Sequence, residues 1–150
     1  MGEVADAVDI VRIMQMIPHR YPLLLVDKVV DMIPGERAVG IKNVTFNEPQ
    51  FQGHFPRRPV MPGVMIIESM AQTAGVLVVH TLGKEAEGKL VYFLSIDNAR
   101  FRKPVVPGDV MHIHVVKDRQ RGNVWKFNCE VKVDGKLASE ATISAMIVDG

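Results

Sequence analysis

The segment PGVMIIESMAQTAGVLVVHTL, residues 62–82, is the longest predominantly apolar stretch of this 150-residue chain. Pro62 can occupy the first position of a helix and Gly83 provides a stop, so we predict one helix over these residues. Its apolar side chains lie nearly all the way round, which is typical of a helix buried on most sides. Gly75, in the middle, costs about 1 kcal/mol and indicates a close backbone approach there.

The same segment is long enough to cross a bilayer. Glu68 interrupts it without a cationic partner in the segment, and an unpaired carboxylate inside lipid is costly. The N-terminal MGEVADAVDIVRIMQ carries acidic residues and lacks the cationic start and apolar run of a secretory signal. These features predict a cytoplasmic protein with no membrane insertion.

Composition narrows the class of protein further. A chain of this length can bury roughly 70% of its surface, so we expect one domain spanning residues 1–150. The formal net charge is +1, from 18 basic and 17 acidic residues, which gives no global field to hold nucleic acid. One cysteine, Cys129, excludes an intramolecular disulfide and a cysteine-cluster metal site.

The residues before the long helix suggest a short helix and a hairpin. A helix is expected over residues 7–16, and strands over 22–33 and 36–46 are expected to pair across the turn Pro34-Gly35. The short helix would bury four side chains: Val8, Val11, Ile13 and Met14. Residues 47–63 contain four prolines and are predicted to form an irregular loop.

After Gly88 the hydrophobic period changes to two, and turn signals divide the rest into about four antiparallel strands. The clearest strand alternates Trp125, Phe127, Cys129 and Val131 with polar residues. Six strands and one buried helix have few packing solutions. We therefore predict an α+β fold in which a six-stranded antiparallel sheet wraps around one central helix.

The candidate catalytic residues lie closest together in HFPRRPVMPGVMIIE, residues 54–68. His54 lies on the proline-rich loop, Gly63 opens the long helix with unpaired N–H groups, and Glu68 lies within that helix. A base, an oxyanion donor and a carboxyl group would thus converge in one short segment, as proton removal next to a carbonyl requires. Each of these residues also has a structural interpretation. His54 could simply be solvated, Gly63 could only start the helix, and Glu68 could only form a hydrogen bond with Gln72.

At this point the sequence resembles the β-hydroxyacyl-acyl-carrier-protein dehydratases of type II fatty acid synthesis. The matching motifs are HFP at 54–56, PVMPGV at 59–64, Glu68 and AQ at 71–72, with PHRYPLLLVD at 18–27 and FRKPVVPGD at 101–109. They cover about nine-tenths of the chain in the same order. The family has the hotdog fold, which agrees with the sheet and helix expected above.

The resemblance assigns a role to each site residue. It implies that His54 is the catalytic base, that Glu68 is the catalytic acid, that the Gly63 N–H binds the thioester oxygen and that the Val60 carbonyl orients the His54 ring. Glutamate at position 68, where the isomerising sister group has aspartate, points to the dehydratase-only branch. Arg57 departs from the glycine of many members and bears on carrier-protein docking.

The implied activity is that of a hydro-lyase, the reversible dehydration of a (3R)-3-hydroxyacyl thioester to the trans-2-enoyl thioester and water. It needs no metal, nucleotide or redox cofactor, and the substrate is carried on the phosphopantetheine of acyl carrier protein. The resemblance also implies a homodimer with shared active sites, of a kind that often assembles into hexamers as trimers of dimers.

Two other functions stay open at the level of sequence, an acyl-thioester hydrolase and a non-catalytic acyl-binding regulator. The basic cluster Arg100, Arg102 and Lys103 is the candidate docking site for the acidic carrier, and a second basic cluster comprises Lys117, Arg119 and Arg121. The remaining histidines and aromatic residues are assigned structural or surface roles: His19 in a turn, His80 at a helix end, His112 and His114 on an exposed strand face rather than at a shared metal, and Tyr92 and Phe93 in the core rather than along an acyl tunnel.

Overall fold

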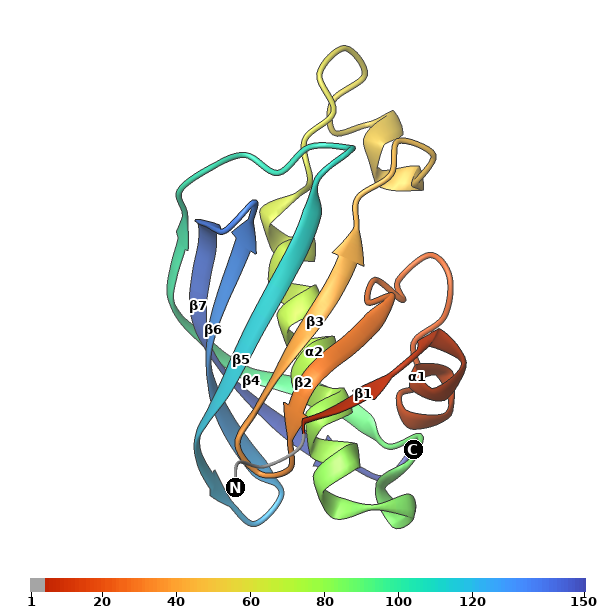
Figure 1. The fold of residues 1–150 in the computed structure, drawn as a ribbon, viewed down its shortest axis with the longest axis vertical. Helices are drawn as coiled ribbons and strands as arrows, with labels where there is room; N and C mark the ends of the chain where they lie inside the picture. The colour runs from red at the N-terminus through yellow and green to blue at the C-terminus, as the bar shows by residue number, and fades with distance from the viewer. Residues whose placement is uncertain (1–4) are drawn as a thin grey trace.

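The computed structural model describes residues 5–150 and contains one long helix enclosed by a curved sheet (Figure 1). All neighbouring strands are antiparallel, in the order β1-β2-β3-β5-β6-β7-β4. The strands are β1 Asp6–Val8, β2 Lys28–Ile33, β3 Arg37–Asn43, β4 Leu90–Phe101, β5 Val110–Arg121, β6 Val124–Val133 and β7 Lys136–Val148. The predicted α+β fold, a sheet wrapped around a central helix, is confirmed.

The sheet has one strand more than the six expected, because the residues predicted to begin the short helix form a strand instead. Asp9 caps α1 (Ile10–Met16) by accepting the Arg12 N–H at 3.0 Å, and the residues before it pair with β2 as β1. The buried face of α1 also differs from the prediction. Ile13 and Met16 are fully buried, whereas 64% of Val11 is exposed.

The central helix α2 spans Gly63–Leu82, with Pro62 as its N-cap and Gly83 as its C-cap at φ 96°. Every residue from Ser69 to Val79 is buried, so the helix forms the centre of the hydrophobic core. In length and composition α2 could cross a membrane, but 72% of its most apolar window is buried inside the molecule. The apolar character of this segment is therefore explained by its place in the core.

At Gly40 on β3 the sheet lies close against α2. A Cβ atom there would stand 2.1 Å from the Thr73 hydroxyl oxygen. At Gly75, where the sequence indicated a close backbone approach, a Cβ would instead meet the Val91 side chain at 3.3 Å. The tight helix–sheet contact thus depends on a glycine of the sheet.

The hairpin and the late strands agree with the prediction in type and differ in length. β2 pairs with β3, but it begins at Lys28 rather than Pro22, because the Leu23 and Leu24 N–H groups both bond to the Arg20 carbonyl in a turn. In β6 the buried and exposed side chains alternate as expected. On β4, however, Tyr92 is 54% exposed, so its expected core role is wrong.

Candidate active site

His54 lies on the loop between β3 and α2, which Figure 1 shows extending beyond the end of the sheet. The loop contains the short 3-10 helix η1 (Pro49–Gln52), whose Phe51 is buried in the core. The His54 N–H donates to the Gln50 carbonyl at 3.1 Å, directly after that helix. Phe51 therefore anchors the loop one turn before the histidine.

The His54 ring is oriented by the backbone of Val60. Its Nδ1 lies 2.7 Å from the Val60 carbonyl oxygen, and the Val60 N–H donates to the His54 carbonyl at 3.0 Å. Because a carbonyl can only accept, the neutral ring carries its proton on Nδ1 and presents an unprotonated Nε2. An imidazole in this tautomer can act as a general base.

A pocket of about 310 Å³ brings His54 together with the start of α2. Its lining includes His54, Val60 and Gly63, together with Phe101 and its neighbours on the segment after β4. Gly63 is the first residue of α2, so its N–H has no partner in an earlier helical turn. A Cβ at this position would stand 2.9 Å from the Phe101 ring, so a larger residue would require that ring to move.

Glu68 does not line this pocket. It follows Gly63 by five residues, which places it about 140° further round the helix axis. Its carboxylate Oε2 lies 2.8 Å from Gln72 Nε2 and 3.4 Å from His19 Nε2. The expectation that base, oxyanion donor and acid converge within one short segment is thus met for His54 and Gly63 but not for Glu68.

Gln72 holds the Glu68 carboxylate in place. The Gln72 amide is fully buried, and its Oε1 accepts the Leu25 N–H at 2.9 Å. Its Nε2 donates to the Leu23 carbonyl at 2.6 Å and to Glu68 Oε2. Since the Leu25 N–H fixes the orientation of the amide, Glu68 Oε2 always faces a donor, and Oε1 is the oxygen left to carry a proton.

His19 belongs to this second group rather than only to a turn. Its Nε2 approaches Glu68, and its Nδ1 is buried without a hydrogen-bond partner among residues 5–150. The turn itself is held by Arg20, whose guanidinium donates to the Met14 and Ile17 carbonyls. Nothing in the local sequence around His19 could have indicated its contact with Glu68, which lies in another element.

The basic cluster lies partly at the mouth of the His54 pocket. Arg102 and Lys103 line that pocket, and the Arg102 guanidinium is ion-paired with Glu140 at 2.8 Å. Arg100 lies opposite Glu140 in the β4–β7 register. The Glu140 carboxylate therefore offsets part of the positive charge of this cluster. Lys103 adds a positive charge at the pocket itself.

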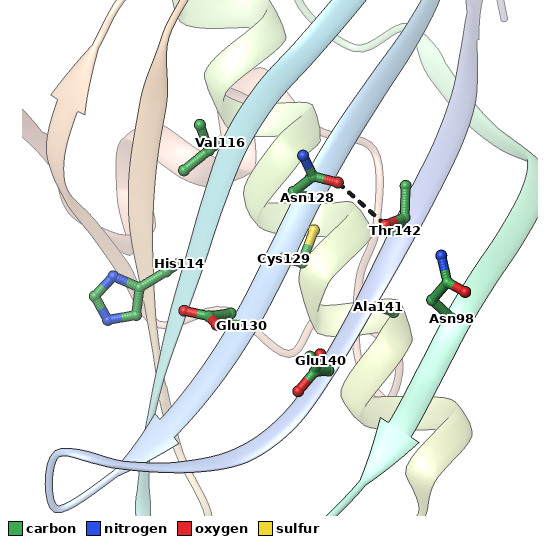
Figure 2. Close-up of a pocket in the computed structure, with 9 residues that line it drawn as sticks. All are labelled: Asn98, His114, Val116, Asn128, Cys129, Glu130, Glu140, Ala141 and Thr142. Carbon is green, nitrogen blue, oxygen red and sulfur yellow. Dashed lines mark hydrogen bonds between the residues drawn. The ribbon is translucent and has the colours of Figure 1, made fainter.

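A second pocket, of about 300 Å³, lies on the face of the sheet that points away from α2 (Figure 2). Polar side chains of four strands form it, among them His114, Asn128 and Glu140, and Asn128 accepts a hydrogen bond from Thr142 at 3.1 Å. Burial, then nearby Lys132 and His112, lower the pKa of His114, so this imidazole stays neutral near pH 7. His54, Gly63 and Glu68 are all absent from its lining.

Comparison with known proteins finds relatives over nearly the whole chain. The chain matches the model of the FabA-like domain over residues 17–142. It is 69% identical over 147 residues to a 3-hydroxyacyl-acyl-carrier-protein dehydratase FabZ of Paramagnetospirillum magneticum, covering 98% of this chain and 91% of that protein. A protein of the same name from Rhodospirillum rubrum is 66% identical over 148 residues, covering 99% and 92%.

Among solved structures, the dehydratase heterocomplex ApeI:P from Xenorhabdus doucetiae superimposes with a TM-score of 0.76. The alignment covers 91% of each chain at 19% sequence identity. This likeness establishes a shared fold.

Proposed function

The chain belongs to the FabA-like family, and from this premise we propose that it catalyses the reversible dehydration of (3R)-3-hydroxyacyl-acyl-carrier-protein to the trans-2-enoyl thioester and water in fatty acid elongation. The observation that carries the proposal is the identity of 60–69% over nearly the whole chain to several dehydratases of that name. The chain is therefore a hydro-lyase. That it acts as a single domain in the cytoplasm is part of our proposal.

The proposed chemistry begins at His54. Its Nε2 removes the C2 proton of the substrate while the Val60 carbonyl holds Nδ1–H in place. Negative charge then develops on the thioester oxygen, and the Gly63 N–H with the positive end of the α2 dipole stabilises it. Such stabilisation makes the C2 proton more acidic, and glycine at position 63, without a side chain, leaves its N–H open to close approach.

Glu68 then completes the elimination. Its Oε1, free of the Gln72 amide, gives a proton to the departing 3-hydroxyl, so that the C3–O bond breaks, water leaves and the C2–C3 double bond forms. The proton taken by His54 balances the one that Glu68 donates. These groups supply base, acid and oxyanion donor, so the proposed reaction uses no cofactor apart from the phosphopantetheine that carries the substrate.

The separation of Glu68 from the His54 pocket supports a site shared between two chains. We propose a homodimer in which Glu68 of one protomer faces His54 of its partner. The outer edge of β4 suits such pairing, because β4 is a twelve-residue strand bonded only to β7 within the described sheet. Exposed apolar side chains line it, including Tyr92, Leu94 and Ile96.

The proposal includes a hexamer made of three dimers, since dimers of this kind often assemble in threes. Sedimentation equilibrium distinguishes a dimer from a hexamer by mass alone. Acyl carrier protein is the proposed partner, and Arg100, Arg102 and Lys103 are its proposed docking residues, because two of them line the mouth of the His54 pocket.

The absorbance of the enoyl thioester tests the reaction. Adding 3-hydroxyacyl-carrier-protein substrates of several lengths should produce the enoyl signal, and the length with the highest kcat/KM defines the preferred chain. A saturated acyl thioester serves as the control, because a hydrolase would release free thiol from it. Thiol release without enoyl formation would make the protein a hydrolase, and binding without either would make it an acyl-binding regulator.

A further inference from the structure

A largely water-shielded ion pair joins the end of β3 to the loop that carries His54. Lys42, near the end of β3, is buried and its partner Glu48 is partly buried, with side-chain exposures of 7% and 15%. The Lys42 Nζ lies 2.6 Å from Glu48 Oε1. Removing two charges from water is costly, and neither residue takes part in the proposed reaction. We therefore expect the pair to have a structural role that offsets this cost.

The Glu48 carboxylate joins the strand to the start of the loop and, through Gln50, is linked to its end. Besides Lys42, its Oε1 accepts from Gln50 Nε2 at 3.1 Å, and its Oε2 accepts the Thr45 N–H at 2.8 Å. Gln50 Nε2 also lies 3.7 Å from the Met61 sulfur. Glu48 therefore fixes the turn where the loop begins and, through Gln50, the residue after Val60.

The chain of contacts from Gln50 leads directly to the base. The Gln50 carbonyl accepts the His54 N–H at 3.1 Å, and Val60, next to Met61, accepts from the His54 ring. The two backbone groups that bond to His54 thus belong to Gln50 itself and to Val60, the residue before Met61. Glu48 orients the Gln50 side chain that contacts Met61. Other carboxylates nearby are engaged elsewhere, Asp27 with the Asn43 N–H and Asp109 with the Val106 N–H.

We propose that Glu48 is the positioning residue of His54, and that its carboxylate, neutralised by Lys42, holds the loop of residues 45–61 in the geometry that proton abstraction requires. This inference rests on the role of His54 as the base. A displacement of about 1 Å in a reacting group can cost roughly 10²-fold in rate. The pair therefore acts on kcat without touching the substrate.

Glu48→Gln tests the proposal with a short soluble 3-hydroxyacyl thioester. The amide presents one acceptor oxygen where the carboxylate offered two, so we expect kcat to fall roughly 10²-fold while KM stays near the wild-type value. Because Glu48→Gln alone leaves Lys42 buried and unpaired, the double variant Lys42→Met/Glu48→Gln removes both charges. Glu87→Gln is the matched control: it breaks an ion pair with Arg12 of 2.7 Å away from the loop and should keep wild-type kcat.

Hydrogen–deuterium exchange reads the loop without any turnover. Peptides covering residues 44–61 should exchange faster in Glu48→Gln than in the wild type and should be unchanged in Glu87→Gln. If wild-type protein fails to dehydrate any hydroxyacyl thioester, the proposed function falls, and the exchange data still decide whether Glu48 orders the loop.

The pH profile supplies a readout that a purely structural role would not move. Burial raises the pKa of Glu48, whereas the Lys42, Thr45 and Gln50 donors together lower it by more. The net shift is downward, so the carboxylate stays charged in acid. In Lys42→Met the effect of burial remains and the main opposing group is lost. The acid limb of kcat should therefore move to higher pH in Lys42→Met than in the wild type.

The proposal is overturned if a folded Glu48→Gln or double variant keeps wild-type kcat and loses only thermal stability. If neither Glu48→Gln nor the double variant folds, the pair serves the fold as a whole rather than His54, and the positioning role is equally refuted.

Discussion

The His54 ring and the Glu68 carboxylate are each fixed by groups that take no direct part in the reaction. The Val60 carbonyl selects the tautomer of His54, and the buried Gln72 amide selects which oxygen of Glu68 can carry a proton. Side chains held in this way lose little freedom when substrate binds. Their removal should consequently affect turnover far more than folding.

His54→Ala and Glu68→Gln test the two proposed roles. Each variant loses a proton-transfer group, so dehydration should fall by about 10²–10⁴-fold, as is typical of general acid–base residues. Melting temperatures should stay close to the wild type, since both side chains lie partly at the surface. A folded variant with nearly full turnover would show that its residue had been assigned the wrong role.

At this scale the sequence predicted one partner of Glu68 and missed the other. Gln72 follows Glu68 by four residues, and helical spacing alone brings such pairs together. His19 belongs to a different segment, and its contact depends on how the turn at Arg20 packs against α2. Contacts across the fold of this kind have no local pattern, which is why His19 was assigned only to a turn.

At the scale of elements, the prolines, the turn glycines and the change of hydrophobic period were enough to place the loop, the hairpin and the central helix. They could not place β1, because three residues are too few to show a period. Nor could they identify Gly40 as the point where sheet and helix meet. That contact joins positions 33 residues apart, and only packing shows it.

Gly40→Ala tests this contact. The added methyl group would overlap the side chain of Thr73, so α2 must move away from β3, at a cost of about 1–3 kcal/mol in the free energy of unfolding. Thermal or denaturant unfolding measures the loss. Gly53→Ala is the matched control, because no atom lies within 4 Å of its added Cβ.

A second substitution sharpens the same prediction. Thr73→Ala removes the overlapping atoms, so it should restore part of the stability that Gly40→Ala loses. If Gly40→Ala proved as stable as Gly53→Ala, the helix would not be held against the sheet at this point.

At the scale of the whole molecule, charge is distributed unevenly although its sum is close to zero. The proposed docking residues lie at the end of the sheet that carries the His54 pocket. Arg119, Arg121 and Lys126 line another pocket, at the β5–β6 hairpin, which Figure 1 shows at the opposite end. The two clusters can therefore be compared directly as docking sites for an acidic carrier.

Reversing Arg102 and Lys103 to Glu should raise KM for carrier-bound substrate and reduce its dependence on salt. A short soluble thioester should be much less affected, because it lacks the acidic partner. Arg119→Glu/Arg121→Glu carries the same change of charge and should have the smaller effect. A larger effect of that pair would move the docking site to the β5–β6 hairpin, and equal losses on both substrates would indicate damage to the site.

The proposed sharing of the active site between chains would be a property of the assembly, which local sequence does not describe. The distance along the helix from Gly63 to Glu68 is only about 7.5 Å, so spacing alone permitted a site within one chain. The structure places Glu68 outside the His54 pocket. A second protomer is the source of the acid in our account.

Mixing inactive His54→Ala chains with inactive Glu68→Gln chains, under conditions that let subunits exchange, tests this account most directly. Random pairing makes half of the dimers mixed, and each mixed dimer has one site with both wild-type groups. The account predicts that about a quarter of wild-type dehydration activity returns. If exchange is demonstrated by mass and no activity returns, each site belongs to a single chain and the shared site is refuted.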